Sequence, residues 1–118
     1  MRGLIAVIAM FLIGSSVVYA HHGLESYDTG QLIEFEGKVV GFRLMDPHSI
    51  LVVEVEASDG AKVVWEVEGG RAAGIVEAGL TREFLGSGPL VRVTGYQSKD
   101  ALCAPNCRMA GQDFDFER

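Results

Sequence analysis

Short runs of alternating apolar and polar residues, separated by turn residues, constrain this sequence most strongly. Residues 50–56 and 62–68 each place an apolar side chain at every second position, the periodicity of a strand with one buried face. The segment Ser58-Asp59-Gly60 between them is typical of a hairpin turn. The side chains expected to face the core in these two runs are Leu51, Val53, Val55, Val63, Trp65 and Val67. This pattern predicts a mainly β protein.

In a longer run before them, the apolar residues shift from one set of alternate positions to the other. Apolar residues follow one parity as far as Val39 and the other parity from Val40 to Leu44. Because Gly37 and Gly41 flank the switch, we expect one long strand with a bulge or bend there.

The second half of the sequence predicts one helix and two more strands. Gly69-Gly70 ends the alternation, residues 71–78 hold helix formers, and Gly79 stands where a helix C-terminus often places glycine. Alternation returns at Leu90–Tyr96 and again at residues 113–116.

The order of these elements is strand, strand, strand, helix, strand, strand. A long bent first strand and a helix between the third and fourth strands suit a small five-stranded OB-like barrel, which also hides strand edges. We therefore expect a mainly β, OB-like barrel with one short helix between strands 3 and 4. An open, sandwich-like meander is the alternative.

Residues 1–20 have the three-part form of an export signal. Arg2 supplies the positive start, Leu4–Ile13 is the apolar run, and Val18 and Ala20 occupy the −3 and −1 positions of a cleavage site. The alternative is an uncleaved anchor, but the run is shorter than the roughly 20 apolar residues that span a bilayer. We predict a periplasmic or secreted protein in which residues 21–118 form a single domain.

Charge and cysteine content narrow the function classes further. The formal net charge of −6 disfavours binding to phosphate backbones, so a nucleic-acid partner is not expected. In an oxidising compartment a disulfide between Cys103 and Cys107 is the default, because roughly 4.4–6.8 Å between Cα atoms is reachable across a Pro-Asn turn. A metal-binding thiolate pair and a redox-active pair are the alternatives.

Several short motifs, in order and at consistent spacing, resemble those of the DUF6152 family of small exported bacterial proteins, whose function is undefined. They run from residue 21 to about residue 99: His21-His22-Gly23, Tyr27-Asp28, Glu36-Gly37-Lys38-Val39, Asp46-Pro47-His48-Ser49, Val64-Trp65-Glu66-Val67-Glu68, Ala78-Gly79-Leu80 and Val91-Arg92-Val93-Thr94-Gly95. The sequence departs from the family in having His-His-Gly for His-His-Ser and Asp-Pro-His for Asn-Pro-His. The resemblance implies an exported β-protein and supplies no activity.

Three histidines are the candidate metal ligands. Cleavage after Ala20 would give His21 a free α-amine, and the amine with the ring nitrogen would chelate a metal ion. Copper(II) suits nitrogen ligands best, and His22 and His48 would supply further imidazoles. The alternatives are a disordered N-terminus and a His48 that shapes its turn or bonds a carboxylate.

No catalytic motif stands out from the sequence, so we do not expect an enzyme. Glu54, Glu56, Glu66 and Glu68 are read as one solvated acidic face. The favoured function is a non-catalytic binding or accessory domain for a periplasmic protein or a small ligand, without a stable membrane anchor after cleavage. The alternative function is copper binding through His21 and His48, and a small enzyme is a third hypothesis.

Overall fold

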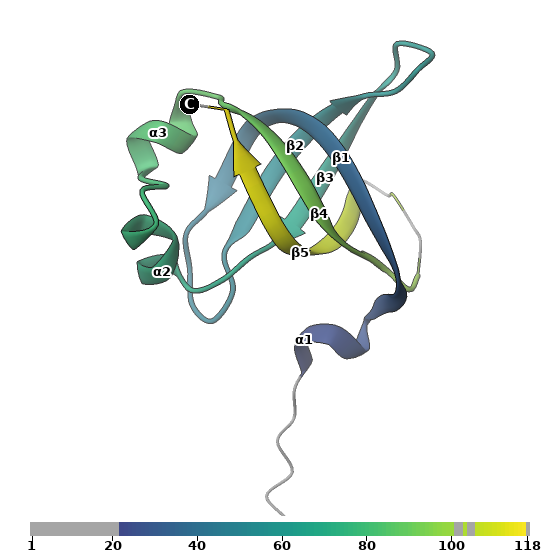
Figure 1. Cartoon of the computed structure of the whole chain (residues 1–118), viewed down its shortest axis with the longest axis horizontal. Helices are drawn as coiled ribbons and strands as arrows, with labels where there is room; N and C mark the ends of the chain where they lie inside the picture. Colours follow the sequence, from purple (N-terminus) through teal and green to yellow (C-terminus); the bar gives the residue numbers. More distant parts are fainter. Residues whose placement is uncertain (1–21, 101–102, 104–105, 118) are drawn as a thin grey trace, which may run out of the picture.

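Figure 1 shows the computed structural model, which describes residues 22–100, 103 and 106–117. The predicted export signal at residues 1–20 and the predicted ligand His21 lie outside the described residues. In chain order the elements are α1 (His22–Glu25), β1 (Tyr27–Arg43), β2 (Ile50–Glu56), β3 (Lys62–Glu68), α2 (Ala72–Glu77), α3 (Arg82–Gly86), β4 (Leu90–Ser98) and β5 (Cys107–Phe116).

Strand β1 is 17 residues long and pairs with two different neighbours. Its residues from Lys38 onward run antiparallel to β2, and those up to Lys38 run antiparallel to β4. The register with β2 shifts between Val39 and Gly41, which confirms the bulge expected beside the glycines. The change of partner along one strand allows the sheet to close on itself.

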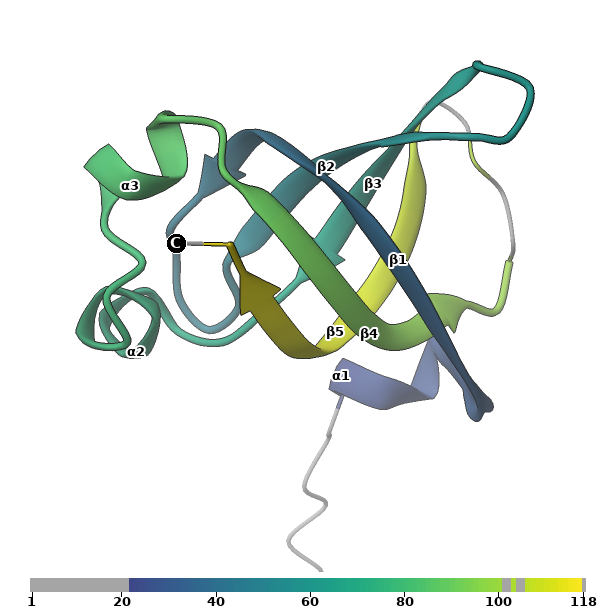
Figure 2. The same ribbon diagram turned by 45° about the horizontal axis from the view of Figure 1, so that its top comes forward.

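The five strands form a closed barrel in the order β1-β2-β3-β5-β4 (Figure 2). Strand β5 completes the barrel by pairing in parallel with β3 and antiparallel with β4. The expected five-stranded barrel is confirmed, and the open meander is wrong. The finer assignment to the OB class stays a prediction.

Two features differ from the pattern in the sequence, which predicted one helix between the third and fourth strands and located only the end of the last strand. Strands β3 and β4 are joined by two short helices, α2 and α3, because Gly79 adopts a positive φ of 90° and stops α2. Strand β5 begins at Cys107 rather than near residue 113. Burial alternates only over its first three residues and breaks where Met109 and the adjacent Ala110 are both buried, so this stretch is too short for a period of two to reveal it.

The barrel interior is filled from every strand. The buried core consists of Val39, Leu51, Val53, Val67, Leu85, Val91, Val93 and Met109. This set confirms the predicted inward parity of the second, third and fourth strands. Trp65 packs against the core and stacks on Phe35, with 4.9 Å between ring centroids, as its inward parity predicts.

Gly95 allows β5 to pass very close to β4. A Cβ atom at residue 95 would overlap the carbonyl oxygen of Ala110 and would lie 3.1 Å from the Cα atom of Gly111. The register of β4 and β5 shifts at this same place, between Thr94 and Gly95. Glycine at residue 95 is therefore a requirement of barrel closure.

Cys103 and Cys107 lie at disulfide-bonding distance, with 3.9 Å between their Cα atoms, and this confirms the predicted pairing. The separation is shorter than the expected range because only three residues lie between the cysteines. Cys107 is the first residue of β5 and is buried, so the pair fixes the point at which β5 enters the barrel.

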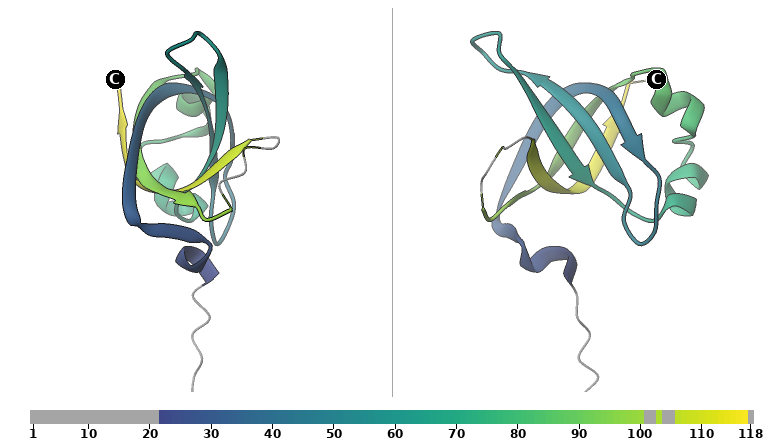
Figure 3. Two further views of the ribbon diagram at one scale, coloured as in Figure 1. Left: turned by 90° about the vertical axis from the view of Figure 1, so that its right-hand side faces the viewer. Right: turned by 180° about the vertical axis from the view of Figure 1, so that it is seen from behind.

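Helices α2 and α3 lie together on one side of the barrel, and the β2–β3 hairpin projects from the opposite side (Figures 1 and 3). Across the hairpin, Lys62 forms an ion pair with Glu54 at 3.0 Å, diagonally from its register partner Glu56. Within the described part of the chain, none of the helices has the length and apolarity needed to traverse a bilayer.

Candidate functional site

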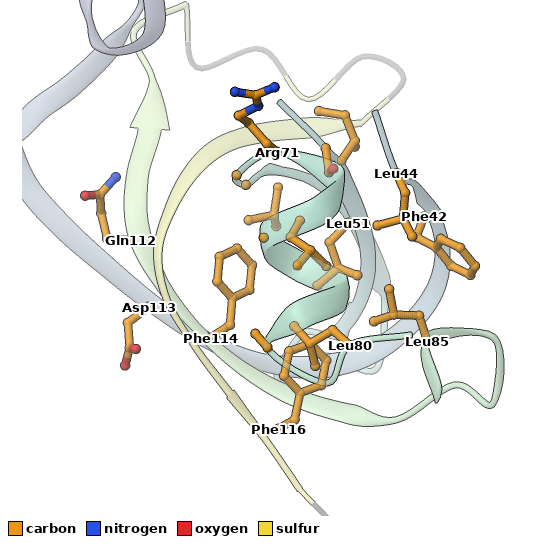
Figure 4. Close-up of a pocket in the computed structure, with 18 residues that line it drawn as sticks. Phe42, Leu44, Leu51, Arg71, Leu80, Leu85, Gln112, Asp113, Phe114 and Phe116 are labelled. Atoms are coloured by element: carbon orange, nitrogen blue, oxygen red, sulfur yellow. The ribbon is translucent and has the colours of Figure 1, made fainter. Parts of the chain in front are cut away.

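A cavity of about 410 Å³ lies between helix α2 and the adjacent end of the barrel. Its apolar lining comes from strands β1, β2, β3 and β5, from helices α2 and α3 and from the loops beside them, and includes Leu44, Leu51, Ile75, Leu80, Phe114 and Phe116. Figure 4 shows Leu51, Leu80 and Phe114 gathered in the same space beside α2. The side chains thus form an apolar surface that reaches from the core to the outside.

Helix α2 is attached to the β1–β2 loop at its N-terminal end. Asp46 on the β1–β2 loop accepts a hydrogen bond from the backbone N–H of Ala72 at 3.0 Å. The same carboxylate lies 3.5 Å from the guanidinium of Arg71. None of the side chains in α2 is buried, because the cavity lies beneath the helix where core packing would otherwise be.

The loop opposite α2 is held in a fixed shape by Ser49. The hydroxyl of Ser49 donates to the carbonyl of Met45 and accepts from the Met45 N–H, each at 3.1 Å. The backbone of Ser49 also bonds to Gly69 and Gly70, each at 2.8 Å. These contacts fix one wall of the cavity, since Ser49, Gly69 and Gly70 line it.

A cluster of three titratable side chains adjoins this wall, since His48 and Glu68 directly precede Ser49 and Gly69 in the chain. Tyr27 donates a hydrogen bond of 2.5 Å to one oxygen of Glu68, and His48 Nδ1 lies 3.5 Å from the other oxygen. Tyr27 is 9% exposed, whereas the side chain of His48 is 49% exposed. Glu68 therefore links the start of β1 to the β1–β2 loop.

Burial of the phenol raises the pKa of Tyr27 above its ordinary value near 10, and the hydrogen bond and negative charge of Glu68 raise it further. The positive charge of Arg108 opposes this shift, and the charge of Asp100 adds to it. The phenol is consequently a neutral hydrogen-bond donor throughout the physiological pH range.

Replacement of Tyr27 by phenylalanine is expected to lower the free energy of unfolding by about 1.5 kcal/mol at pH 7, because a hydrogen bond to a carboxylate is lost. The wild-type contribution is complete below about pH 10. It declines as pH rises further, because the unfolded chain then loses the phenol proton while the folded chain keeps it. Urea unfolding at pH 7 and pH 11 would measure both effects, and equal pH dependence of the two proteins would contradict this role.

The predicted acidic face is partly wrong. Glu66 pairs with Arg43 at 2.9 Å, and Glu54 pairs with Lys62, so these two carboxylates lie at the surface beside cations. Glu68 instead contacts the buried Tyr27 and the imidazole of His48. The alternation pattern could not distinguish Glu68 from Glu54 and Glu66, because all three glutamates occupy outward-facing positions in the pattern.

The structure places only part of the predicted metal site. His48 lies beside Glu68, and His22 begins α1, five residues before Tyr27. His21 lies outside the described residues. Among the described residues, no group of three or more His, Cys, Asp or Glu side chains is arranged to hold a metal ion.

Comparison with known proteins gives one match. A family model described as "Family of unknown function (DUF6152)" matches residues 10–104, and this agrees with the resemblance seen in the motifs. The match includes His48 and Glu68 and ends before β5, which supplies Phe114 and Phe116 to the cavity. No curated protein and no solved structure shows significant similarity to the chain.

Proposed function

The chain belongs to the DUF6152 family, a family of unknown function, and from this premise we propose that it is an exported, non-catalytic domain that binds a small, largely apolar molecule. The observation that carries the proposal is the cavity of about 410 Å³ between α2 and the barrel. Binding sites for small molecules have volumes of roughly 300–1,000 Å³ and mainly apolar linings with a few polar groups. The cavity has both properties.

The side chains around the cavity favour binding over catalysis. The hydroxyl of Ser49 is engaged on both sides by Met45, so it is poorly placed to act as a nucleophile. The Tyr27–Glu68–His48 cluster contributes no lining residue. A ligand would therefore meet mostly apolar surface, which stabilises a complex without activating a reacting group.

Export is supported by two features of the sequence. The form of residues 1–20 is that of a signal peptide, and the Cys103–Cys107 pair suits an oxidising compartment. A periplasmic or secreted domain of this kind would take up its ligand outside the cytoplasm.

The test uses 1-octanol as an apolar probe and isothermal titration calorimetry as the measurement. Replacement of Gly74 by leucine is expected to weaken octanol binding at least tenfold, because Gly74 lines the cavity and open space surrounds its Cβ position. The matched control is Ala73→Leu, at the neighbouring exposed position of α2 outside the lining. Binding that is absent in the wild type, or unchanged in Gly74→Leu, would overturn the proposal.

Copper binding through His21, His22 and His48 is a second candidate function, favoured by the position of Glu68. Copper(II) prefers a tetragonal site, in which adjacent ligand atoms about 2 Å from the ion lie roughly 2.8 Å apart. His48 Nδ1 and Glu68 Oε1 lie 3.5 Å apart, so a small approach of the half-exposed imidazole would bring both side chains onto one ion.

The N-terminal histidines are tied to this pair through Tyr27. Tyr27 bonds to Glu68, and the five residues from His22 to Tyr27 span at most about 18 Å even when fully extended. The His21-His22 pair would supply the remaining nitrogen ligands, provided that cleavage frees the amine of His21.

Copper(II) titration of the exported protein would test this candidate. The variants His48→Gln and Glu68→Gln are each expected to weaken binding by roughly 10- to 100-fold. The matched control is Glu66→Gln, two residues earlier on β3. Affinity that depends on His21 and His22 but is unchanged in both test variants would mean chelation by the N-terminus alone, contrary to the candidate.

A further inference from the structure

Arg71 supplies the positive charge at the mouth of the cavity. Among the lining side chains of the described chain, Arg71 is the one cation and Asp113 the one anion. The side chain of Arg71 is 76% exposed, and Figure 4 shows it at the edge of the apolar cluster. A ligand bound in the cavity would therefore bring its outer end close to a guanidinium.

The guanidinium has hydrogen-bonding capacity beyond its contact with Asp46. An arginine side chain carries five N–H donors. The nearest Arg71–Asp46 distance, 3.5 Å, is longer than an ordinary N–H···O hydrogen bond. Asp46 also accepts the Ala72 N–H, so its carboxylate is shared between two partners. A second carboxylate could approach Arg71 in the bidentate arrangement that guanidinium groups favour.

Asp113 faces a different part of the surface. In Figure 4 the side chains of Gln112 and Asp113 point away from the apolar cluster. Asp113 pairs with Thr94 on β4, and the Thr94 hydroxyl donates to Glu34 on β1, so these groups share the outer face of the barrel. The negative charge of Asp113 is therefore aimed away from the outer end of a bound ligand.

We propose that the cavity takes an apolar molecule carrying one carboxylate, with the apolar body between α2 and the barrel and the carboxylate on Arg71. This inference rests on the proposed function and adds the chemical class of the ligand. The negative net charge of the protein opposes it only weakly, because exposed charges beyond about 8 Å are screened at physiological ionic strength. In the proposed complex the carboxylate would contact Arg71 directly and would compete there with Asp46.

The experiment compares octanoate, 1-octanol and octylamine by isothermal titration calorimetry at pH 7 in physiological salt. The three probes share the alkyl chain and differ in the charge of the end group. Octanoate is expected to bind at least tenfold more tightly than octanol, and octylamine most weakly, because Arg71 repels the ammonium group.

Two variants locate the effect at Arg71. In Arg71→Gln the advantage of octanoate over octanol should disappear, and the ratio of the two affinities is the measured quantity because Arg71 lines the cavity and contacts Asp46. In Asp46→Asn octanoate should bind several-fold more tightly, because the competing charge is gone while an oxygen remains to accept the Ala72 N–H. Arg82→Gln, on α3 and outside the lining, is the control.

The outcomes separate this inference from the proposed function. If none of the three probes binds, the proposed function fails. If octanol binds as tightly as octanoate, or octylamine binds most tightly, the cavity is a binding site but the carboxylate assignment is overturned. An octanoate advantage that survives in Arg71→Gln and does not grow in Asp46→Asn also overturns it.

Discussion

Replacement of Gly95 by alanine is expected to lower the free energy of unfolding by about 3 kcal/mol, at the upper end of the usual cost of overpacking. The added Cβ atom would overlap the Ala110 carbonyl oxygen and lie 3.0 Å from the Ala110 carbonyl carbon. Both neighbours belong to the backbone of β5, so no side-chain rotation relieves the clash. Urea unfolding followed by Trp65 fluorescence would measure the loss.

Gly70→Ala is the matched control for this substitution. No heavy atom lies within 4 Å of a Cβ atom at residue 70. The control should therefore be as stable as the wild type, or slightly more stable because alanine restricts the unfolded chain. Similar free energies for the two variants would show that β5 does not approach β4 as closely as described.

Replacement of Met109 by alanine is expected to cost about 3 kcal/mol, through lost burial and the cavity left behind. Met109 is fully buried, at 0% exposure, and pairs in register with Val67 of β3. The same substitution at Met45, which is 47% exposed on the β1–β2 loop, should change stability by less than about 0.5 kcal/mol. Chemical denaturation would measure the free energy of unfolding of the two variants. Because the same side chain is removed in both, a difference between them reports the effect of burial.

This comparison also tests the architecture. Met109 is buried because β5 lies between β3 and β4 and turns that side chain into the barrel. In an open sheet the side chain would lose contacts on one side, and its truncation would cost little more than that of Met45. Equal effects in the two variants would thus contradict a closed barrel.

Alternation in the sequence predicted the strands that have one buried face. Strands β2 and β3 begin and end where the pattern places them, and Leu51, Val53 and Val67 are buried as expected. The start of β5 could not be predicted in this way, because a register shift and consecutive buried residues interrupt its period of two. Local pattern thus predicts a strand but not an irregular pairing.

The candidate sites were less predictable than the strands. The cavity is built from residues far apart in the sequence, such as Leu44, Ile75 and Phe114, which the barrel brings together. Glu68 occupies the same outward-facing set of positions as Glu54 and Glu66, and only its hydrogen bond from Tyr27 distinguishes it. His48 was identified from residue type, while its carboxylate partner required the fold.

The two partners of strand β1 also determine when the barrel can form. Lys38 pairs with Glu54 in a nearby strand and with Leu90 in one that is synthesised much later. Until β4 and β5 are available, β1 and β3 would each present an unpaired edge on which another chain could add. Domains dominated by such distant pairings fold in roughly milliseconds to seconds. Under the proposed export, a slow closing step would give the chain time to reach a translocation channel before its barrel closes.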